Sequence, residues 1–122
     1  MQVFLTRDSV AAGDDADAPH ARTTTVPDGT SIEAIVAIIA KSGYLASIRG
    51  GKATWVVTSK IPLAVVAQEW EKPKMLLDKP RLDDVVRFNK LDTVDNGLRL
   101  HFRYFVQRDP QIVYEELQRE PK

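Results

Sequence analysis

Residues 23–43, TTTVPDGTSIEAIVAIIAKSG, carry the signals for a strand, a tight turn and a capped helix in direct succession. β-Branched residues fill positions 23–26, which favours a pleated strand, and the Pro-Asp-Gly sequence that follows supplies a turn. Thr30 and Glu33 have the spacing of a capping box, in which each side chain satisfies a free backbone N–H group at the helix start. This spacing predicts a helix that begins near Ser31.

The predicted helix has a single apolar stripe. Its large aliphatic residues recur at i, i+3, i+4 and i+7, while alanines keep the rest of the surface thin enough for a sheet to approach closely. Lys41 stands where the helix dipole favours a cation, and Gly43 suits the left-handed residue that follows many helices. The stripe consists of Ile32, Ile35, Val36 and Ile39.

The length and composition of the chain are those of one domain. A chain of 122 residues can bury roughly two-thirds of the surface of its unfolded state without disulfides or metals. It contains no cysteine, which excludes a disulfide framework, a thiolate nucleophile and cysteine-held metal centres, and which favours a reducing compartment. The first residues alternate like a strand and not like a signal peptide, and no apolar run approaches the roughly 20 residues that span a bilayer. We therefore expect a single α+β domain over residues 1–122, located in the cytoplasm and not at a membrane.

The charges of the chain balance in total but not along the sequence. Seventeen basic and seventeen acidic side chains leave no net charge that would draw the chain to nucleic acid or to an anionic membrane. Residues 1–40 hold two basic and six acidic side chains, whereas residues 41–122 hold 15 and 11. This distribution predicts a polarised molecule.

Residues 7–21, RDSVAAGDDADAPHA, are rich in small residues and aspartate and have little to bury. Such a composition predicts a mobile loop. Closely spaced carboxylates also suit a calcium or magnesium ion, but the segment lacks the alternating ligands, the central glycine and the terminal glutamate of an EF-hand loop. We favour the solvated loop and expect no metal there. The aspartates concerned are Asp8, Asp14, Asp15 and Asp17.

Further strands are predicted after the helix. Residues 44–49 and 52–58 have the composition of short strands on either side of Gly50-Gly51. Residues 61–69, IPLAVVAQE, form a continuous apolar run, which predicts a central strand that is buried on both faces. Residues 70–84 contain two prolines around a small apolar cluster, which favours an extended crossing segment.

The last third of the chain predicts a β-hairpin and a short helix. Residues 85–91 and 98–107 flank Asp95-Asn96-Gly97, and a three-residue loop would place the apolar side chains of both strands on one face. A two-residue Asn-Gly loop would instead mix polar and apolar side chains on that face, so we favour the longer loop. The Asp-Pro pair at positions 109–110 is typical of a helix start, and it predicts a helix that reaches about Gln118.

The order of these elements resembles the ubiquitin-like β-grasp pattern over residues 1–70, with Val26-Pro27-Asp28-Gly29-Thr30 as the junction from strand to helix. The resemblance implies a mixed or antiparallel sheet packed on one main helix. Modifiers and sulfur carriers of that fold end in Gly-Gly, whereas this chain ends in Arg-Glu-Pro-Lys, and plant-type ferredoxins of that fold hold their cluster through cysteines, which are absent here. The resemblance therefore implies a non-catalytic interaction domain.

One face of the predicted hairpin is the candidate interaction surface. Guanidinium groups beside an aromatic ring and a histidine could bind an acidic protein, a phosphate group or nucleic acid. The alternative is that this is the ordinary solvent-exposed face of an antiparallel sheet. An exposed Phe105 would argue against that alternative, because an apolar side chain surrounded by charges is typical of an interface. The residues of this face are Arg87, Asn89, Arg99, His101, Arg103 and Phe105.

No catalytic sequence motif supports an enzyme. The chain has no G-x-S-x-G elbow, no H-E-x-x-H helix and no phosphate-binding G-x-x-x-x-G-K loop. We therefore expect a non-enzymatic module without cofactor that binds another protein, such as a bacterial adaptor or immunity-type protein. Binding of nucleic acid or a phosphate ligand through Arg87, Arg99 and Arg103 is the first alternative. A small hydrolase or isomerase centred on His101 is the second, and it requires a pocket with another polar group directed at the imidazole.

Overall fold

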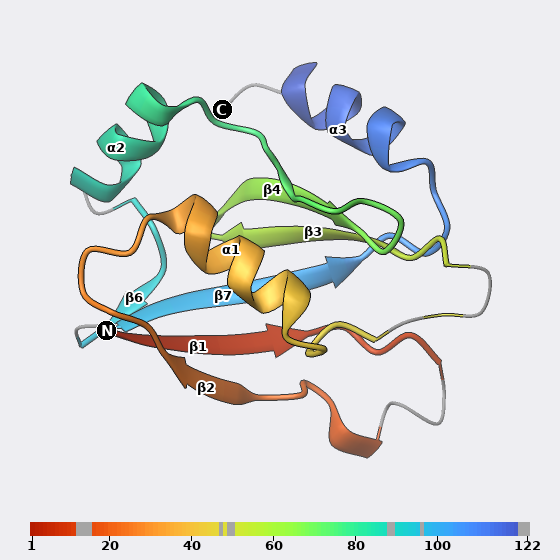
Figure 1. Cartoon of the computed structure of the whole chain (residues 1–122), viewed down its shortest axis with the longest axis horizontal. Coiled ribbons are helices and arrows are strands. Elements are labelled where there is room, and N and C mark those ends of the chain that lie inside the picture. The colour runs from red at the N-terminus through yellow and green to blue at the C-terminus, as the bar shows by residue number, and fades with distance from the viewer. Residues whose placement is uncertain (12–15, 47, 49–50, 88–89, 96, 120–122) are drawn as a thin grey trace.

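The computed structural model describes residues 1–11, 16–46, 48, 51–87, 90–95 and 97–119. These residues form one seven-stranded sheet and three helices (Figure 1). In chain order the elements are β1 (Gln2–Arg7), β2 (Arg22–Thr25), α1 (Ile32–Lys41), β3 (Thr54–Ser59), β4 (Ile61–Ala67), β5 (Lys74–Met75), α2 (Lys79–Arg87), β6 (Thr93–Val94), β7 (Gly97–Tyr104) and α3 (Pro110–Arg119).

The sheet is mixed. Its strand order is β2-β1-β7-β3-β4-β5, and β6 pairs with the start of β7. β1 and β7 are parallel, with Val3 opposite Leu98, whereas the other strand pairs are antiparallel. A strand from the start of the sequence, β1, thus lies beside a strand from its last third, β7. The predicted α+β class with a mixed sheet is confirmed.

Helix α1 covers one face of the sheet, which we call the inner face (Figure 1). Ile35, Val36 and Ile39 are buried against the inward side chains of the strands, including Trp55 and Phe102. The predicted apolar stripe is therefore correct. Burial of each such side chain contributes about 1.5–3 kcal/mol, so this interface is the main core of the molecule.

The start of α1 differs from the prediction by one residue. Ser31, not Thr30, caps the helix, because its Oγ accepts the N–H of Ala34 at 3.1 Å. The hydroxyl of Thr30 donates instead to the carbonyl of Pro27 at 2.6 Å and closes the preceding turn. The end of the helix is as predicted, since Gly43 has φ +83°, the left-handed conformation that favours glycine.

Helix α3 covers part of the opposite face of the sheet, which we call the outer face. Val113 of α3 is buried with Val56 of β3, Val65 of β4 and Leu76. Asp109 caps this helix by accepting the N–H of Gln111 at 2.9 Å, as the sequence predicts. Of the helices in the described residues, α3 packs on the outer face, and it does so at β3 and β4.

The run 61–69 forms β4, and residues 63–67 are buried on both faces of the sheet, as predicted. β4 lies between β3 and the two-residue β5, so β7 and β3 form the middle of the sheet. One strand prediction needs correction. Residues 44–46 and 48 do not form a strand, and residues 47 and 49 lie outside the described residues. Tyr44 is nevertheless buried in the main core.

The prediction of a strand over residues 85–91 is wrong. Residues up to Arg87 belong to α2, which begins at Lys79 within the segment expected to be extended. Asp78 provides the helix start, because its Oδ1 accepts the N–H of Arg81 at 3.0 Å, and Pro80 has the fixed φ of a first helical turn. An aspartate followed two residues later by proline was the sequence signal for this helix.

In place of the predicted long hairpin, the two-residue strand β6 pairs with the start of β7. Val94 lies opposite Gly97, so Gly97 belongs to the strand and not to a three-residue loop. The ring of Phe4 lies against Gly97, where a Cβ atom would collide with it. Glycine is therefore required at this position for close packing.

Two backbone hydrogen bonds connect described parts of segment 7–21 with β1 and β7, and the mobile loop stays a prediction. The N–H of Asp8 donates to the carbonyl of Phe102, and the N–H of Arg7 donates to the carbonyl of Pro19, both at 3.0 Å. Residues 12–15, which include two of the four aspartates, lie outside the described residues. Among the residues that the structure describes, no three histidine or acidic side chains are grouped as metal ligands require.

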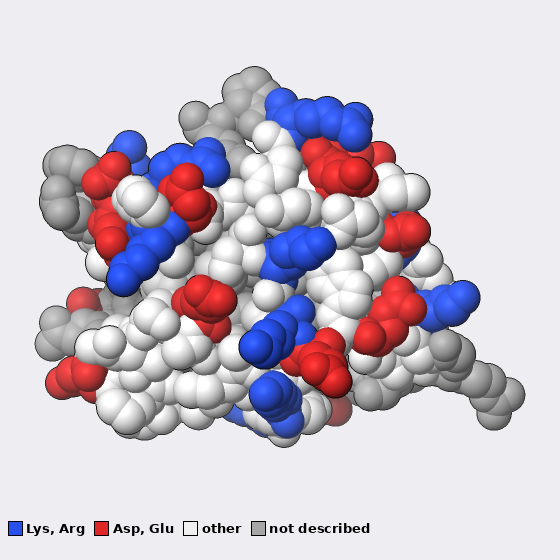
Figure 2. Space-filling model, turned by 45° about the horizontal axis from the view of Figure 1, so that its top comes forward, with Lys and Arg blue, Asp and Glu red and all other residues white. Residues whose placement is uncertain are grey.

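The surface charges are mixed. Figure 2 shows basic and acidic side chains interspersed over the face that it displays, without a continuous area of one sign. Within the described residues, none of the helices has the length and apolar character needed to cross a bilayer.

Candidate functional site

Helix α3 does not cover the outer face of the sheet at β2, β1 and β7. Along β1, Val3 and Leu5 are buried on the inner face, whereas Phe4 and Thr6 are partly exposed on the outer face. Phe4 lies opposite Arg99 and Thr6 opposite His101, so these side chains share one side of the sheet. We call this surface the open face, and its outward residues are Phe4, Thr6, Thr23, Thr58, Arg99 and His101.

A hollow of about 510 Å³ lies on the open face and extends to the turn after β3. Besides the outward residues of the open face, it is bordered by Lys60 and Asp92. Arg22 also borders it, but the Arg22 guanidinium lies 5.0 Å from the centroid of the Tyr44 ring, which belongs to the inner core. The cations available to the hollow are therefore Arg99 and Lys60.

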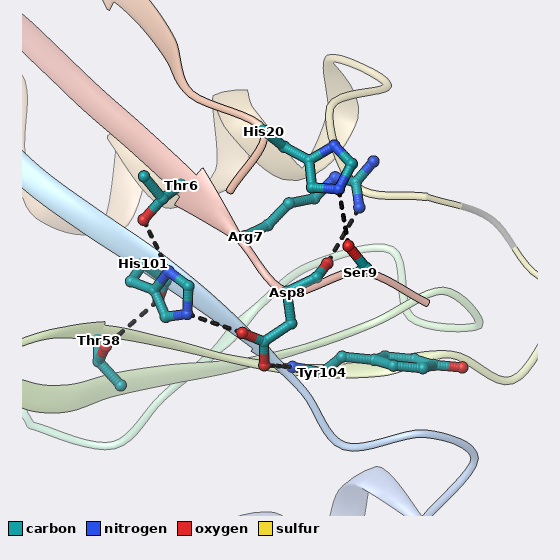
Figure 3. A network of polar contacts seen from close by, with 8 residues as sticks. All are labelled: Thr6, Arg7, Asp8, Ser9, His20, Thr58, His101 and Tyr104. Atoms are coloured by element: carbon teal, nitrogen blue, oxygen red, sulfur yellow. Dashed lines mark hydrogen bonds and ion pairs between the residues drawn. The ribbon is translucent and has the colours of Figure 1, made fainter. Parts of the chain in front are cut away.

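His101 is held between two polar side chains at the edge of this hollow (Figure 3). Its Nδ1 lies 2.7 Å from Oγ1 of Thr6, and its Nε2 lies 3.0 Å from Oδ1 of Asp8. Because a carboxylate only accepts hydrogen bonds, Nε2 donates to Asp8, while Nδ1 shares a hydrogen bond with the Thr6 hydroxyl. The second oxygen of Asp8 accepts the N–H of Tyr104 at 2.9 Å, which fixes the carboxylate in turn.

This hydroxyl, imidazole and carboxylate chain meets one condition for catalysis, because His101 borders a hollow and has polar groups directed at its ring. Both ring nitrogens, however, already have partners. Neither is free to accept or donate a proton to a bound molecule in this arrangement. The geometry supports a role in which Asp8 and Thr6 position the imidazole and join β1 to β7.

The cations Arg99 and Lys60 border the hollow together with the Asp92 carboxylate. Both cations are exposed, and among the described residues neither side chain has a hydrogen bond or an ion pair. Arg99 offers a planar fork of N–H donors, whereas Lys60 offers a compact charge on a flexible stem. Lys60 has φ +65°, an uncommon conformation for a non-glycine residue, at the turn from β3 to β4. Two exposed cations thus border one hollow, and neither has a partner among the residues that the structure describes.

The structure brings together only part of the predicted face. Arg99 and His101 lie on the open face, and Arg103 is exposed further along β7. Arg87 belongs to α2 and not to a strand beside β7, and Asn89 lies outside the described residues.

Phe105 is not the exposed apolar contact that the sequence suggested. It is half-buried and packs against the cluster under α3. The guanidinium carbons of Arg103 and Arg108 lie 5.1 and 5.8 Å from its ring centroid. Phe105 therefore belongs to the covered part of the outer face, and its two arginines form cation–π contacts there.

Seven residues of the site were missed in the sequence: Phe4, Thr6, Asp8, Thr23, Thr58, Lys60 and Asp92. The alternation of β1 does place Phe4 and Thr6 on the side opposite Val3, so their shared side was readable. What was not readable was the parallel pairing of β1 with β7, since it joins residues about 95 positions apart.

A larger hollow of about 1140 Å³ lies between the start of α1, β5, α2 and α3. Its lining includes aliphatic side chains such as Met75, Leu77 and Leu82, and the charged side chains among its residues, such as Arg81 and Asp83, carry both signs. These features do not select a class of ligand. The open face is the stronger candidate site.

No protein-family model matches this chain, and neither a curated protein nor a solved structure matches it. The functional argument therefore rests on the geometry of the open face.

Proposed function

We propose that this chain is a non-enzymatic interaction module of β-grasp architecture that binds an acidic segment of another protein through its open face. The strand order β2-β1-β7-β3-β4, with β1 parallel to β7 and helix α1 on the inner face, supports the β-grasp architecture. The strands β5 and β6 and the helices α2 and α3 are then additions to that plan.

One observation carries the functional part of the proposal. At β3 and β4 the outer face is apolar and α3 covers it. At β1 and β7 α3 does not cover it, and the hollow there is bordered by Arg99 and, from the turn after β3, by Lys60, which have no partner among the described residues. Unpaired cations beside a partly exposed aromatic ring form a surface that an acidic, partly apolar segment can complement. Phe4 supplies that ring.

A protein partner fits this surface better than nucleic acid does. Binding of a nucleic-acid backbone depends on several cations that follow successive phosphates. Here Asp92 borders the same hollow as Arg99 and Lys60, and Asp8 lies at its edge on His101. These two carboxylates balance the two cations, so the hollow lacks the run of positive charge that a nucleic-acid backbone requires.

The proposal is tested by affinity capture from cells that express the protein, with the chain immobilised. We expect the double variant Arg99→Glu and Lys60→Glu to lower the recovery of its specific protein partner at least about tenfold, since two attractive contacts become repulsive. Lys52→Glu is the matched control, because Lys52 is also exposed but precedes β3 at the end far from Lys60.

Equal recovery of every captured protein with all three variants would remove the open face as the binding surface. Recovery that disappears after nuclease treatment, together with a steep loss on adding salt, would replace the protein partner with nucleic acid.

A further inference from the structure

We propose that the hollow of the open face binds a phosphate monoester, carried by a phosphorylated side chain in the partner segment. This inference rests on the proposed function and states which chemical group of the partner is recognised. It is argued from the donors that border the hollow, from its size and from its floor.

The donors of the hollow match a phosphate group. Arg99 can donate two parallel N–H bonds to two phosphate oxygens, and Lys60 can approach a third. The hydroxyl of Thr23 is exposed and has no hydrogen bond among the described residues, so it is a further donor. A phosphate monoester offers three acceptor oxygens and a charge of about −1.5 to −2, whereas a carboxylate offers two oxygens and a charge of −1. Two cations and a hydroxyl are thus better satisfied by phosphate.

Among the other polar groups of the hollow, the Thr6 and Thr58 hydroxyls are already hydrogen-bonded, whereas the Asp92 carboxylate carries a negative charge like the ligand. The Thr6 hydroxyl shares a hydrogen bond with His101, and the Thr58 hydroxyl donates to the carbonyl oxygen of His101 at 3.3 Å. These bonds hold β1, β7 and β3 together beneath the ligand site. The site is therefore held in position before binding, which lowers the entropic cost of ordering it.

The size and floor of the hollow favour a phosphorylated side chain over free phosphate. A volume of about 510 Å³ lies within the range of sites for whole small molecules and exceeds the needs of one phosphate group. The ring of Phe4 lies on the same face, packed against Gly97, and offers an apolar surface to the group that carries the phosphate.

The test uses NMR titrations of the full chain with small probes at constant ionic strength. Phenyl phosphate should bind about 2- to 10-fold more tightly than inorganic phosphate, because its ring can contact Phe4, and at least about tenfold more tightly than benzoate. The backbone N–H shifts that change should belong to β1, β2 and β7. A decamer of deoxythymidine is the probe for nucleic acid.

Variants assign the binding to the donors. Arg99→Gln should weaken the binding of phenyl phosphate about tenfold or more, and Arg99→Lys should weaken it less, because the charge remains while the fork is lost. Lys52→Gln is the control and should leave the affinity unchanged. Because Arg99 and Lys52 are both exposed, each variant should keep the urea midpoint of unfolding of the parent chain.

Several outcomes would overturn the inference. They are an absence of saturable shifts on the open face, equal affinities for phenyl phosphate and benzoate, and tighter binding of the decamer than of phenyl phosphate. Phosphatase treatment of the cell extract separates this inference from the proposed function. If capture of the partner depends on Arg99 but survives phosphatase, the interaction module stands and phosphate recognition is wrong. If capture depends on neither, both are wrong.

Discussion

The two halves of the outer face share one pattern of strand alternation but differ in composition. Val56 and Thr58 lie two residues apart on β3 and point to the same side of the sheet. Val56 is fully buried under α3, whereas Thr58 borders the hollow. β7 likewise places Arg99 and His101 where no helix covers them. The outward residues are thus apolar where α3 packs on them and polar or charged where it does not. The charged half is the open face, which stays accessible.

The largest effect is expected in the covered half. Leu76 is fully buried in the cluster with Val113, so Leu76→Ala should lower the free energy of unfolding by about 2–5 kcal/mol through lost burial and a residual cavity. Urea unfolding followed by tryptophan fluorescence measures this change. Thr23→Ala on the open face is the control, with an expected change below about 0.5 kcal/mol. A loss below about 1 kcal/mol for Leu76→Ala would contradict the view that α3 packing stabilises this half.

The same contrast explains how much of the fold could be predicted. α1 and α3 were readable because their signals are local: an apolar stripe and an Asp-Pro start. α2 was missed because the apolar residues near its end suggested a strand, although Asp78 and Pro80 mark a helix start. Local signals from capping side chains outweigh residue composition in such a short segment.

The candidate site was readable only in part, for the same reason. The alternation along β7 correctly separates Arg99, His101 and Arg103 from the buried side chains. The neighbours of that row depend on which strand pairs with β7, and no local signal contains this information. Only the folded structure therefore shows that Phe4 and Lys60 belong to the site and that Arg87, which lies in α2, does not.

A second prediction concerns the packing of the open half itself. In Gly97→Ala the new Cβ would collide with the Phe4 ring and come within 3.1 Å of the carbonyl oxygen of Gln2. We expect a loss of about 1–3 kcal/mol in the free energy of unfolding, as is typical of overpacking. Phe4→Ala removes the ring, so the double variant should lose less than the sum of the single losses. A double-mutant cycle in urea measures this coupling, and additive losses would show that the ring does not limit position 97.

The smallest effect tests whether hydrogen bonds take the place of a helix in holding the open half. Tyr44 donates its hydroxyl hydrogen to the carbonyl of His20 at 2.6 Å, which fastens the segment leading into β2. The side chain is 5 % exposed, and burial raises the pKa of its hydroxyl above the ordinary value, although the nearby Arg7 and Arg22 act in the opposite direction. Tyr44→Phe should lower the free energy of unfolding by about 0.5–1.5 kcal/mol near pH 8, the usual net contribution of one hydrogen bond.

The pH dependence of this loss distinguishes the hydroxyl from the ring. Because the pKa of Tyr44 is higher in the folded than in the unfolded chain, the folded chain binds the proton more tightly, and its stabilising effect is complete below about pH 10. As the pH rises above about 10 towards the folded-state pKa, the parent chain should lose this stability and Tyr44→Phe should not. Urea unfolding of both chains at pH 8 and pH 10.5 measures the difference, and the other tyrosines cancel in it. If both chains lose the same stability over this interval, the Tyr44 hydroxyl does not fasten the open half, and the strand pairing of β1 with β7 must hold it without that bond.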